Sequence, residues 1–437
     1  MSDADILVIG AGAAGLMAAR TLAKAGKKIA VLEARERCGG RIHTLKRSKL
    51  LEAVELGAEF VHGDLPFTLN LLNEAGVGYY AGTAEMWQYK NGRFDNEGGF
   101  MPDWVLLMDR LGKLQQDISI EDFLQQEFPG DKYHNLKNSV RRFVHGYDTA
   151  ETAKVSALAL QKEWQCEDDD LQYRIKGGYG AIINHLEKEF KKEGGFIHLN
   201  SVVKDIHWQP GKVKAITEEG KVYEAEKILI ALPLGVLKAM EQEKGAVTFH
   251  PKTPEHADAI NLMGFGAIIK ILLEFDELFW EDKITEALAG KSLKNMGFLI
   301  SGEEIPTWWT QVPTRSPILT GWLGGPEAMR KKDLPGEEIL SQSLRSLSNI
   351  FKRSQEELMD KLKSYYITNW TSEPFTRGSY AFDIVGAQAS RKILNTPLND
   401  TIFFAGEYLY DGYAMGTVEA AFASGEEVAK RIINFNF

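Results

Sequence analysis

The sequence is poor in cysteine, has no excess of basic residues and contains no long apolar run. Its two cysteines, Cys38 and Cys166, lack metal-type spacing, so we expect neither a metal site nor a disulfide. Asp and Glu (61) outnumber Lys and Arg (51), and the net charge of −10 makes nucleic acid an unexpected partner. The apolar runs 228–232 and 267–273 are far shorter than the ~20 residues of a membrane span, and no span is expected.

Basic residues are also scarce at the start of the sequence. Asp3 and Asp5 stand where a signal peptide would have positive charge. Because cysteine is scarce as well, we expect a reducing cytoplasm. The composition that remains, 44% apolar and 26% charged residues over 437 positions, is typical of a globular chain of two or three domains. It gives no indication of oligomeric state.

The first forty residues have the pattern of a βαβ unit. Two apolar runs typical of buried strands, 6–9 and 29–32, flank a helix-forming stretch at 16–25. A parallel sheet is expected to begin here.

A glycine loop joins the first strand of this unit to its helix. Gly10, Gly12 and Gly15 have the G-x-G-x-x-G spacing, and Glu33 closes the second strand. The first glycine permits a tight turn, the second lets backbone N–H groups approach a pyrophosphate, and the third lets helix and strand pack closely. The acid can accept the hydroxyl protons of a ribose. The order of strand, loop, helix, strand and acid predicts dinucleotide binding.

The rest of the chain changes character twice. Residues 67–174 show mainly helical periodicity and few strand signals. Strand patterns then occur at 196–199, 202–208, 213–217, 227–232, 268–275, 365–370 and 402–406, before a final helix at 416–432. We expect the strands between 196 and 232 to form a small antiparallel sheet that leads back to the main sheet.

A second glycine-rich segment follows Glu33 and reads Ala34-Arg35-Glu36-Arg37-Cys38-Gly39-Gly40-Arg41. Two adjacent glycines allow the backbone to bend around a ribose and pyrophosphate, and the following guanidinium balances phosphate charge. With this segment the sequence resembles the flavin-containing amine oxidase superfamily, which includes monoamine oxidases, polyamine oxidases and histone demethylases. Further similar blocks, in the family's order, are LGAEFVHG at 56–63, LPLGVL at 232–237, the segment 370–380, FAGE at 404–407 and GTVE at 416–419.

The resemblance implies an α/β fold with a Rossmann-type FAD-binding domain, which we expect to span 1–66, 175–260 and 385–437. A second, α+β substrate domain would comprise a helical insertion, 67–174, and a sheet part, 261–384. The positions expected to bind FAD by this resemblance and by the glycine loop are Gly10, Gly12, Ala14, Gly15, Glu33, Ala34, Arg35, Gly40, Arg41, Gly57, Ala58, Glu59, Phe60, Val203, Trp370, Gly406, Glu407, Thr417 and Val418.

The same resemblance suggests how FAD is held. Ser379 stands where monoamine oxidases have the cysteine that bonds to the flavin, so we expect FAD to be bound non-covalently. Glu407 matches an acid that contacts the flavin, and Val203 matches a main-chain contact to adenine. Thr417 and Val418 match backbone donors near the pyrimidine carbonyl of the flavin, where a helix N-terminus stabilises negative charge.

Lys270 and Tyr380 are the strongest catalytic candidates. Lys270 interrupts an apolar strand, where a lysine must either face solvent or have a specific partner. The resemblance aligns it with the lysine that holds a water against the flavin. Tyr380 is either an ordinary packed aromatic residue or the tyrosine that stands on the substrate side of the flavin and orients the amine.

The second aromatic wall of the monoamine oxidases is not matched. Thr417 takes that position, as in histone demethylases and several polyamine oxidases, which argues against a small arylalkylamine substrate. The nearby residues that remain candidates for this wall are Tyr408, Tyr410, Tyr413 and Met415. His62 resembles a histidine close to the substrate in animal polyamine oxidases, although a histidine in such a loop can equally serve only to satisfy backbone groups.

These observations predict an FAD-dependent amine oxidase that resembles the polyamine oxidases. It would oxidise a primary or secondary amine to an imine and use molecular oxygen, forming hydrogen peroxide. One alternative is an L-amino-acid oxidase, in which Arg93, Arg142 or Arg315 would bind the substrate carboxylate, or another FAD-dependent dehydrogenase or desaturase on the same scaffold. Another is a flavin-binding scaffold protein without turnover.

Overall fold

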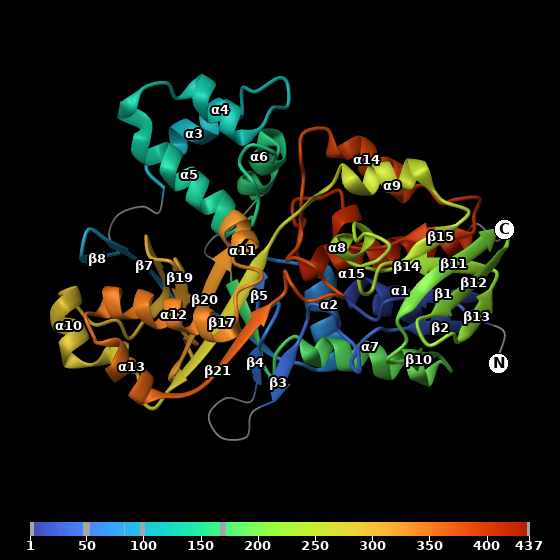
Figure 1. Cartoon of the computed structure of the whole chain (residues 1–437), viewed down its shortest axis with the longest axis horizontal. Coiled ribbons are helices and arrows are strands. Elements are labelled where there is room, and N and C mark those ends of the chain that lie inside the picture. Colours follow the sequence, from blue (N-terminus) through green and yellow to red (C-terminus); the bar gives the residue numbers. More distant parts are fainter. Residues whose placement is uncertain (1–3, 47–52, 83, 97–100, 167–171, 435–437) are drawn as a thin grey trace.

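The computed structural model describes residues 4–46, 53–82, 84–96, 101–166 and 172–434. Figure 1 shows two lobes, one built on a parallel sheet and the other on a larger, mainly antiparallel sheet, with a group of helices above the second.

A five-stranded parallel sheet forms the first lobe. Its order is β10-β2-β1-β14-β23, and every neighbouring pair is parallel. The strands are β1 (Ile6–Ile9), β2 (Ile29–Leu32), β10 (Phe196–His198), β14 (Lys227–Ile230) and β23 (Ile402–Phe404). Numbered along the chain, this is the order 3-2-1-4-5 of a Rossmann-type sheet.

Both faces of this sheet are buried, because its strands are continuously apolar. Ile6 and Val8 pack into one apolar cluster, and Leu7 and Ile9 pack into another. The first cluster includes residues of α1 (Ala13–Lys24), α2 (Pro66–Ala75), α7 (Gly180–Lys192) and α15 (Val418–Asn434). The second includes residues of α9 (Pro254–Asn261), α14 (Ala387–Asn395) and a small sheet.

The small sheet has the order β13-β12-β11-β15. Its strands are β11 (Val203–Gln209), β12 (Lys212–Thr217), β13 (Val222–Ala225) and β15 (Thr248–His250). The pairs β11–β12 and β12–β13 are antiparallel, as predicted, whereas β15 is parallel to β11.

The first strand of the 196–232 region differs from our prediction. β10 does not join the small sheet and instead pairs with β2 at the edge of the parallel sheet. Such a short strand, with Phe196 exposed, has no alternation that distinguishes the two sheets.

Helices α1 and α15 pack very closely. A Cβ added to Gly425 of α15 would lie 2.3 Å from the carbonyl oxygen of Ala14 in α1, so only glycine permits this approach. The N-terminus of α2 is fixed to the same helix, because both carboxylate oxygens of Glu419 accept hydrogen bonds from the backbone N–H groups of Phe67 and Thr68. Residues from both ends of the chain thus hold the first lobe together.

A seven-stranded sheet forms the second lobe, in the order β21-β17-β20-β19-β18-β7-β8. Its strands are β7 (Glu85–Lys90), β8 (Arg93–Asp95), β17 (Ile268–Phe275), β18 (Met296–Ser301), β19 (Thr307–Trp309), β20 (Ile318–Gly324) and β21 (Leu362–Asn369). All neighbours are antiparallel except β18 and β7. Apolar residues of α12 (Gly336–Phe351) and α13 (Gln355–Lys361) pack on its core.

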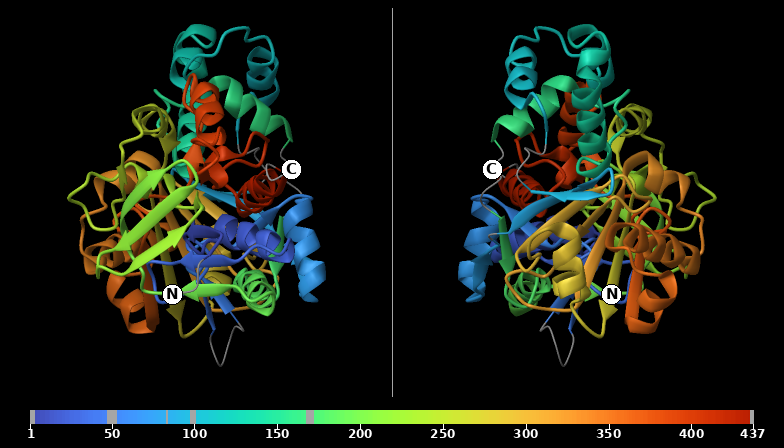
Figure 2. Two further views of the ribbon diagram at one scale, coloured as in Figure 1. Left: turned by 90° about the vertical axis from the view of Figure 1, so that its right-hand side faces the viewer. Right: turned by 90° about the vertical axis from the view of Figure 1, so that its left-hand side faces the viewer.

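The segment 67–174 is less helical than its pattern predicts. It contains a helical group with its own apolar core, which stands at the top of both views in Figure 2. The helices of the group are α3 (Trp104–Leu111), α4 (Ile120–Glu127), α5 (His134–Gly146) and α6 (Ala157–Cys166). However, β7 and β8 belong to the seven-stranded sheet, and α2 packs in the first lobe. The strands are short, so their alternation is weak; in β7 only Trp87 and Tyr89 are buried.

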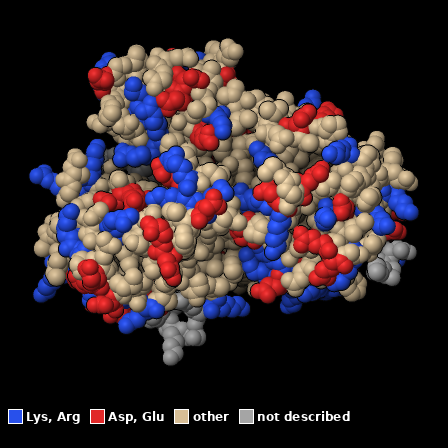
Figure 3. Space-filling view, viewed as in Figure 1, with Lys and Arg blue, Asp and Glu red and all other residues tan. Residues whose placement is uncertain are grey.

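Smaller elements complete the described chain. A three-stranded sheet, β5-β9-β6, is formed by β5 (Phe60–His62), β6 (Tyr79–Ala81) and β9 (Gln172–Ile175). The remaining elements are β3 (Thr44–Lys46), β4 (Ala53–Glu55), α8 (Leu234–Leu237), β16 (Gly264–Phe265), α10 (Lys283–Ala289), α11 (Gly325–Arg330) and β22 (Ala381–Phe382), with short 3₁₀ turns at Asp131–Tyr133, Phe279–Glu281 and Glu407–Leu409. No helix among the described residues has the length and apolar character needed to cross a membrane. On the face shown in Figure 3, acidic and basic side chains are interspersed.

Candidate active site

A cavity of about 1300 Å³ is lined by residues of both lobes. Of the positions expected to bind a cofactor, those on its wall are Gly10, Gly12, Ala14, Glu33, Ala34, Arg35, Gly40, Arg41, Gly57, Ala58, Glu59, Phe60, Val203, Trp370, Gly406, Glu407, Thr417 and Val418. Lys270, Tyr380 and His62 line the same cavity. Gly15 lies outside the lining. The roles of these residues stay predictions, but the fold brings them to one place.

The glycine loop opens the N-terminus of α1 toward the cavity. Gly10 has φ +105°, and a Cβ there would lie 2.7 Å from the carbonyl oxygen of Ala231. Gly12 has open space where a Cβ would be, and no side chain caps α1. A Cβ on Gly15 would lie 2.0 Å from the Gly10 carbonyl oxygen, which explains why Gly15 packs helix against strand and does not face the cavity. Unoccupied N–H groups at a helix N-terminus favour an anion such as pyrophosphate.

Glu33 is buried at the end of β2 and joins the two glycine segments. Its Oε2 accepts a hydrogen bond from the backbone N–H of Ala11 (2.8 Å), and its Oε1 accepts one from that of Arg35 (2.9 Å). Each carboxylate oxygen has a further lone pair. The carboxylate is therefore held in a fixed orientation at the cavity wall and keeps acceptor capacity for ribose hydroxyls.

Two of the three arginines that follow Glu33, Arg35 and Arg41, pair with carboxylates of the protein. Arg41 donates to Glu407 Oε1 (2.8 Å) and to the Ser379 carbonyl oxygen (2.7 Å). Arg35 pairs with Glu373. Arg41 was expected to balance phosphate charge, but in the structure a carboxylate already balances its own charge. Its evident contribution is to connect the segment after β2 to the C-terminal part of the wall.

Lys270 is buried, with 1% of its side chain exposed, so the solvent-facing alternative is wrong. It lies on β17, and its Nζ donates to Glu59 Oε2 (2.6 Å) and to the Gly57 carbonyl oxygen (2.9 Å). Nζ also lies 5.4 Å from the centre of the Trp309 ring. An ammonium has three donors, and the described residues accept two of them.

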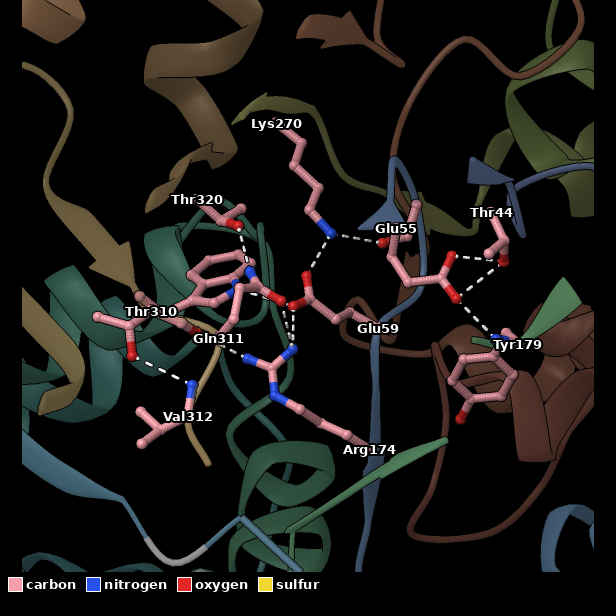
Figure 4. A network of polar contacts seen from close by, with 12 residues as sticks. Thr44, Glu55, Glu59, Arg174, Tyr179, Lys270, Thr310, Gln311, Val312 and Thr320 are labelled. Carbon is pink, nitrogen blue, oxygen red and sulfur yellow. Dashed lines mark hydrogen bonds and ion pairs between the residues drawn. The ribbon is translucent and has the colours of Figure 1, made fainter. Parts of the chain in front are cut away.

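Glu59 was expected to bind the cofactor, and in the structure its carboxylate accepts hydrogen bonds from three side chains of the protein. Its Oε1 accepts hydrogen bonds from Arg174 and from Trp309 Nε1 (3.1 Å). Burial opposes ionisation of this carboxyl, but Lys270 and Arg174 outweigh it and lower its pKa to about 2. Figure 4 shows Lys270 and Arg174 approaching the carboxylate from opposite sides. Sequence reasoning missed Arg174 and Trp309, because nothing in their local patterns indicates a partner so distant along the chain.

Tyr380, His62 and Tyr147 form an aromatic group on the wall. The Tyr380 hydroxyl donates to the Tyr147 carbonyl oxygen, which fixes the orientation of its ring. The His62 and Tyr147 rings are 6.0 Å apart in an edge-to-face arrangement. Burial lowers the pKa of His62 to about 4, so its imidazole is neutral at pH 7.

The C-terminal part of the wall includes the start of α15. Thr417 Oγ1 accepts a hydrogen bond from the Ala420 N–H (3.2 Å) and so caps this helix. Of the four residues considered for a second aromatic wall, only Met415 belongs to the cavity lining. Met415 therefore remains the candidate for this wall, whereas the three tyrosines do not face the cavity.

No cysteine is found among the described residues that line the cavity. Ser379 lines it, and its hydroxyl lies 2.7 Å from that of Thr149. Of the three arginines considered for a substrate carboxylate, Arg142 alone belongs to the lining. Arg93 is exposed on β8, and Arg315 pairs with Glu281.

The chain resembles curated proteins over nearly its whole length. It is 28% identical to Lysine-specific histone demethylase 2 of Homo sapiens over 99% of the chain and 53% of that protein. It is 26% identical to Lysine-specific histone demethylase 1 homolog 3 of Arabidopsis thaliana over 99% of the chain and 30% of that protein. The chain therefore spans about half or less of these demethylases. It is 25% identical to Polyamine oxidase 4 of Oryza sativa subsp. japonica, over 99% of the chain and 90% of that protein.

Solved structures share the fold. Wild-type putrescine oxidase bound to putrescine superposes with a TM-score of 0.79 at 21% identity, covering 99% of both chains. Cyclohexylamine oxidase from Brevibacterium oxydans gives 0.79 at 18% identity over 100% of both chains. These likenesses concern the fold, with its parallel sheet and second lobe. The family described as flavin containing amine oxidoreductase matches residues 13–82 and 105–433. This match covers most of the chain and confirms the resemblance seen in the sequence, so the protein belongs to the flavin-containing amine oxidoreductase family.

Proposed function

We propose that the protein is an FAD-dependent amine oxidase that acts on a primary or secondary amine, such as a polyamine, and transfers the electrons to oxygen. The observation on which this depends most is Lys270. Its ammonium is buried in a cavity whose other walls are a dinucleotide-type glycine loop and an aromatic group. A buried cation needs specific partners, and Lys270 has them.

The residues present fit FAD. The uncapped N-terminus of α1 suits the pyrophosphate, and Glu33 suits a ribose. The N-terminus of α15, with Thr417 and Val418 on the wall, offers a positive helix end to the flavin ring. We expect non-covalent binding, since Ser379 cannot form a thioether. When bound, FAD would supply the hydride acceptor for the carbon next to the amine nitrogen.

The substrate side is suited to an amine. The fixed ring of Tyr380 can orient the amine nitrogen, and the neutral imidazole of His62 does not repel an ammonium group that enters the cavity. A donor of Lys270 is left for a water molecule. The relatives at 25–28% identity include polyamine oxidases and histone demethylases, which supports an amine attached to a long chain.

A second candidate is oxidation of an L-amino acid, because Arg142 lines the cavity. Its Nη2 donates to Ser139 Oγ at 3.3 Å, and no carboxylate pairs with it among the described residues. A substrate carboxylate would pair with such a guanidinium. The two candidates differ in the charge that the substrate presents to this part of the wall.

A substrate panel tests the proposal. Polyamines, diamines, arylalkylamines and L-amino acids are added anaerobically, and bleaching of the flavin absorbance is followed before oxygen is admitted and peroxide measured. Bleaching by polyamines or diamines is the expected result. Bleaching by amino acids alone, lost in Arg142→Met but kept in the control Arg93→Met, would favour the second candidate. If no amine of any class bleaches the flavin, the protein is a scaffold and the proposal is wrong.

A further inference from the structure

Three separate parts of the fold meet at the carboxylate of Glu59. Glu59 precedes β5, Arg174 lies on β9, and Lys270 lies on β17. One oxygen, Oε2, accepts from Lys270 Nζ (2.6 Å), while the other, Oε1, accepts from Arg174 and from Trp309 Nε1 (3.1 Å). Every contact is buried, with 7% of the Glu59 side chain and 1% of that of Lys270 exposed.

Arg174 is itself fixed on several sides. Its Nη2 donates to the Thr310 carbonyl oxygen (2.9 Å) and its Nη1 to Gln311 Oε1 (3.3 Å). Its guanidinium lies over the Phe60 ring at 4.4 Å. Arg174 therefore holds Glu59 on the side away from Lys270, and the contacts that fix Arg174 do not involve Lys270.

Two cations, Lys270 and Arg174, contact one anion, the carboxylate of Glu59. Glu55 is the other buried carboxyl nearby, and burial raises its pKa to about 7, so below that pH it adds little negative charge. It accepts from Thr44 Oγ1 and the Tyr179 N–H, and it does not line the cavity. Without the Glu59 carboxylate, Lys270 and Arg174 would lose the carboxylate to which both donate, and Glu55, whose charge interacts with Lys270, makes its hydrogen bonds with other groups. A buried ammonium without a directly bonded counterion is costly, which favours loss of the lysine proton.

We propose that Glu59 is a positioning residue for the amine oxidation proposed above: its carboxylate keeps Lys270 protonated and fixes its ammonium so that the remaining N–H points into the cavity. Arg174 and Trp309 hold Glu59 in place for this purpose. The inference depends on the proposed function, because it assigns a use to the charge of Lys270. The family resemblance aligns Lys270 with a known lysine but does not identify Glu59 as its partner.

The first test follows the proton of Lys270 directly and needs no turnover. The FAD-bound protein is labelled with ¹³C at lysine Cε, the Lys270 signal is assigned by its absence in Lys270→Met, and its position is followed with pH. In the wild type and in the control Glu55→Gln, which also changes a buried glutamate to its amide, the signal stays that of an ammonium at neutral pH. In Glu59→Gln the signal is expected to change to that of the neutral amine with a midpoint at a lower pH than in the wild type. An unchanged midpoint in Glu59→Gln overturns the inference.

The second test compares this midpoint with the rate of anaerobic flavin reduction. In Glu59→Gln the rate is expected to fall at least about tenfold as pH rises through the midpoint, down to the level of Lys270→Met. A purely structural role of Glu59 would lower the rate equally at every pH, and that result also overturns the inference. If Lys270→Met itself leaves both flavin half-reactions unchanged, Lys270 has no role at the flavin and the inference about Glu59 is overturned. Failure of the proposed function is a different result, namely that no amine reduces the flavin of the wild type.

A second variant guards against misfolding. Glu59→Asp keeps the charge but is shorter, so it loosens the 2.6 Å contact with Lys270 without leaving two unpaired cations. The Lys270 signal of this variant is expected to change at a pH between those of the wild type and Glu59→Gln, because a carboxylate remains close to the ammonium. A Glu59→Asp protein that folds and titrates as the wild type does would contradict the positioning role.

Discussion

Replacing Lys270 by methionine separates a catalytic lysine from a merely buried one. Methionine keeps an unbranched apolar side chain but removes the charge and both hydrogen bonds, to Glu59 and to the Gly57 carbonyl oxygen. Breaking a buried ion pair typically costs roughly 3–5 kcal/mol because one charge is left unpaired. Here Glu59 keeps Arg174 and Trp309, so we expect a smaller loss of stability and a folded, FAD-binding variant.

The rates should change more than the fold does. We expect the reductive or the oxidative half-reaction to slow at least about tenfold, which corresponds to ~1.4 kcal/mol of barrier. Stopped-flow absorbance of the flavin measures both, first with an amine in the absence of oxygen and then with oxygen. Lys363→Met, on the neighbouring strand β21 but exposed, is the matched control and should leave both rates unchanged. Equal rates in both variants and the wild type would refute the reasoning that places Lys270 at the reacting atoms.

Three further outcomes follow from the described contacts. Glu33→Ala should lower FAD occupancy, which is measured as the ratio of flavin to protein absorbance. The enzyme that still contains FAD should turn over normally, because a ribose contact is remote from the reacting atoms. Full occupancy with collapsed turnover would contradict this prediction. Acid precipitation should release the flavin into the supernatant, because Ser379 cannot bond to it, and flavin that stays in the pellet would show a covalent link. Burial raises the pKa of Glu55 from 4.5 to about 7, so the folded protein binds this proton more tightly than the unfolded chain. The contribution of Glu55 to stability should therefore fall by roughly 3 kcal/mol as pH rises from about 4.5 to about 7, measured as the difference between the wild type and Glu55→Gln. Glu55→Gln should lack that loss in urea unfolding at the two pH values, and equal slopes would contradict the assignment.

Local patterns predicted the nucleotide-binding half of the fold well. The apolar runs of β1 and β2, the glycine loop and Glu33 are close in sequence, so their spacing alone indicates their arrangement. β17 was also predicted with its observed bounds, Ile268–Phe275. What failed were features decided by distant partners. β10 pairs with the parallel sheet, and β7 and β8 extend the other sheet, although these short strands have little pattern of their own.

In the candidate site, too, local patterns indicated single residues but not their distant partners. The residue types and their order indicated Lys270 as special, but a lysine in an apolar strand is compatible with an exposed or a buried side chain. Only the fold shows that Glu59 is its partner, since 211 positions separate the two residues in the chain. The contact of Arg41 with Glu407 likewise joins segments 366 positions apart, so no local pattern indicated it. The expected role of Arg41 in balancing phosphate charge stays a prediction.

The close packing of α1 against α15 has a consequence for biosynthesis. A ribosome makes α1 well before β23 and α15, which pair with the sheet and cover α1. Until then the nascent chain exposes the apolar face of α1 and an unpaired edge of β14, surfaces that favour aggregation. The wall residues Gly406, Glu407, Thr417 and Val418 are also made after α1 and β14, so the cavity wall stays incomplete until α15 has been synthesised. We therefore expect a cofactor to bind only after this helix has packed on α1.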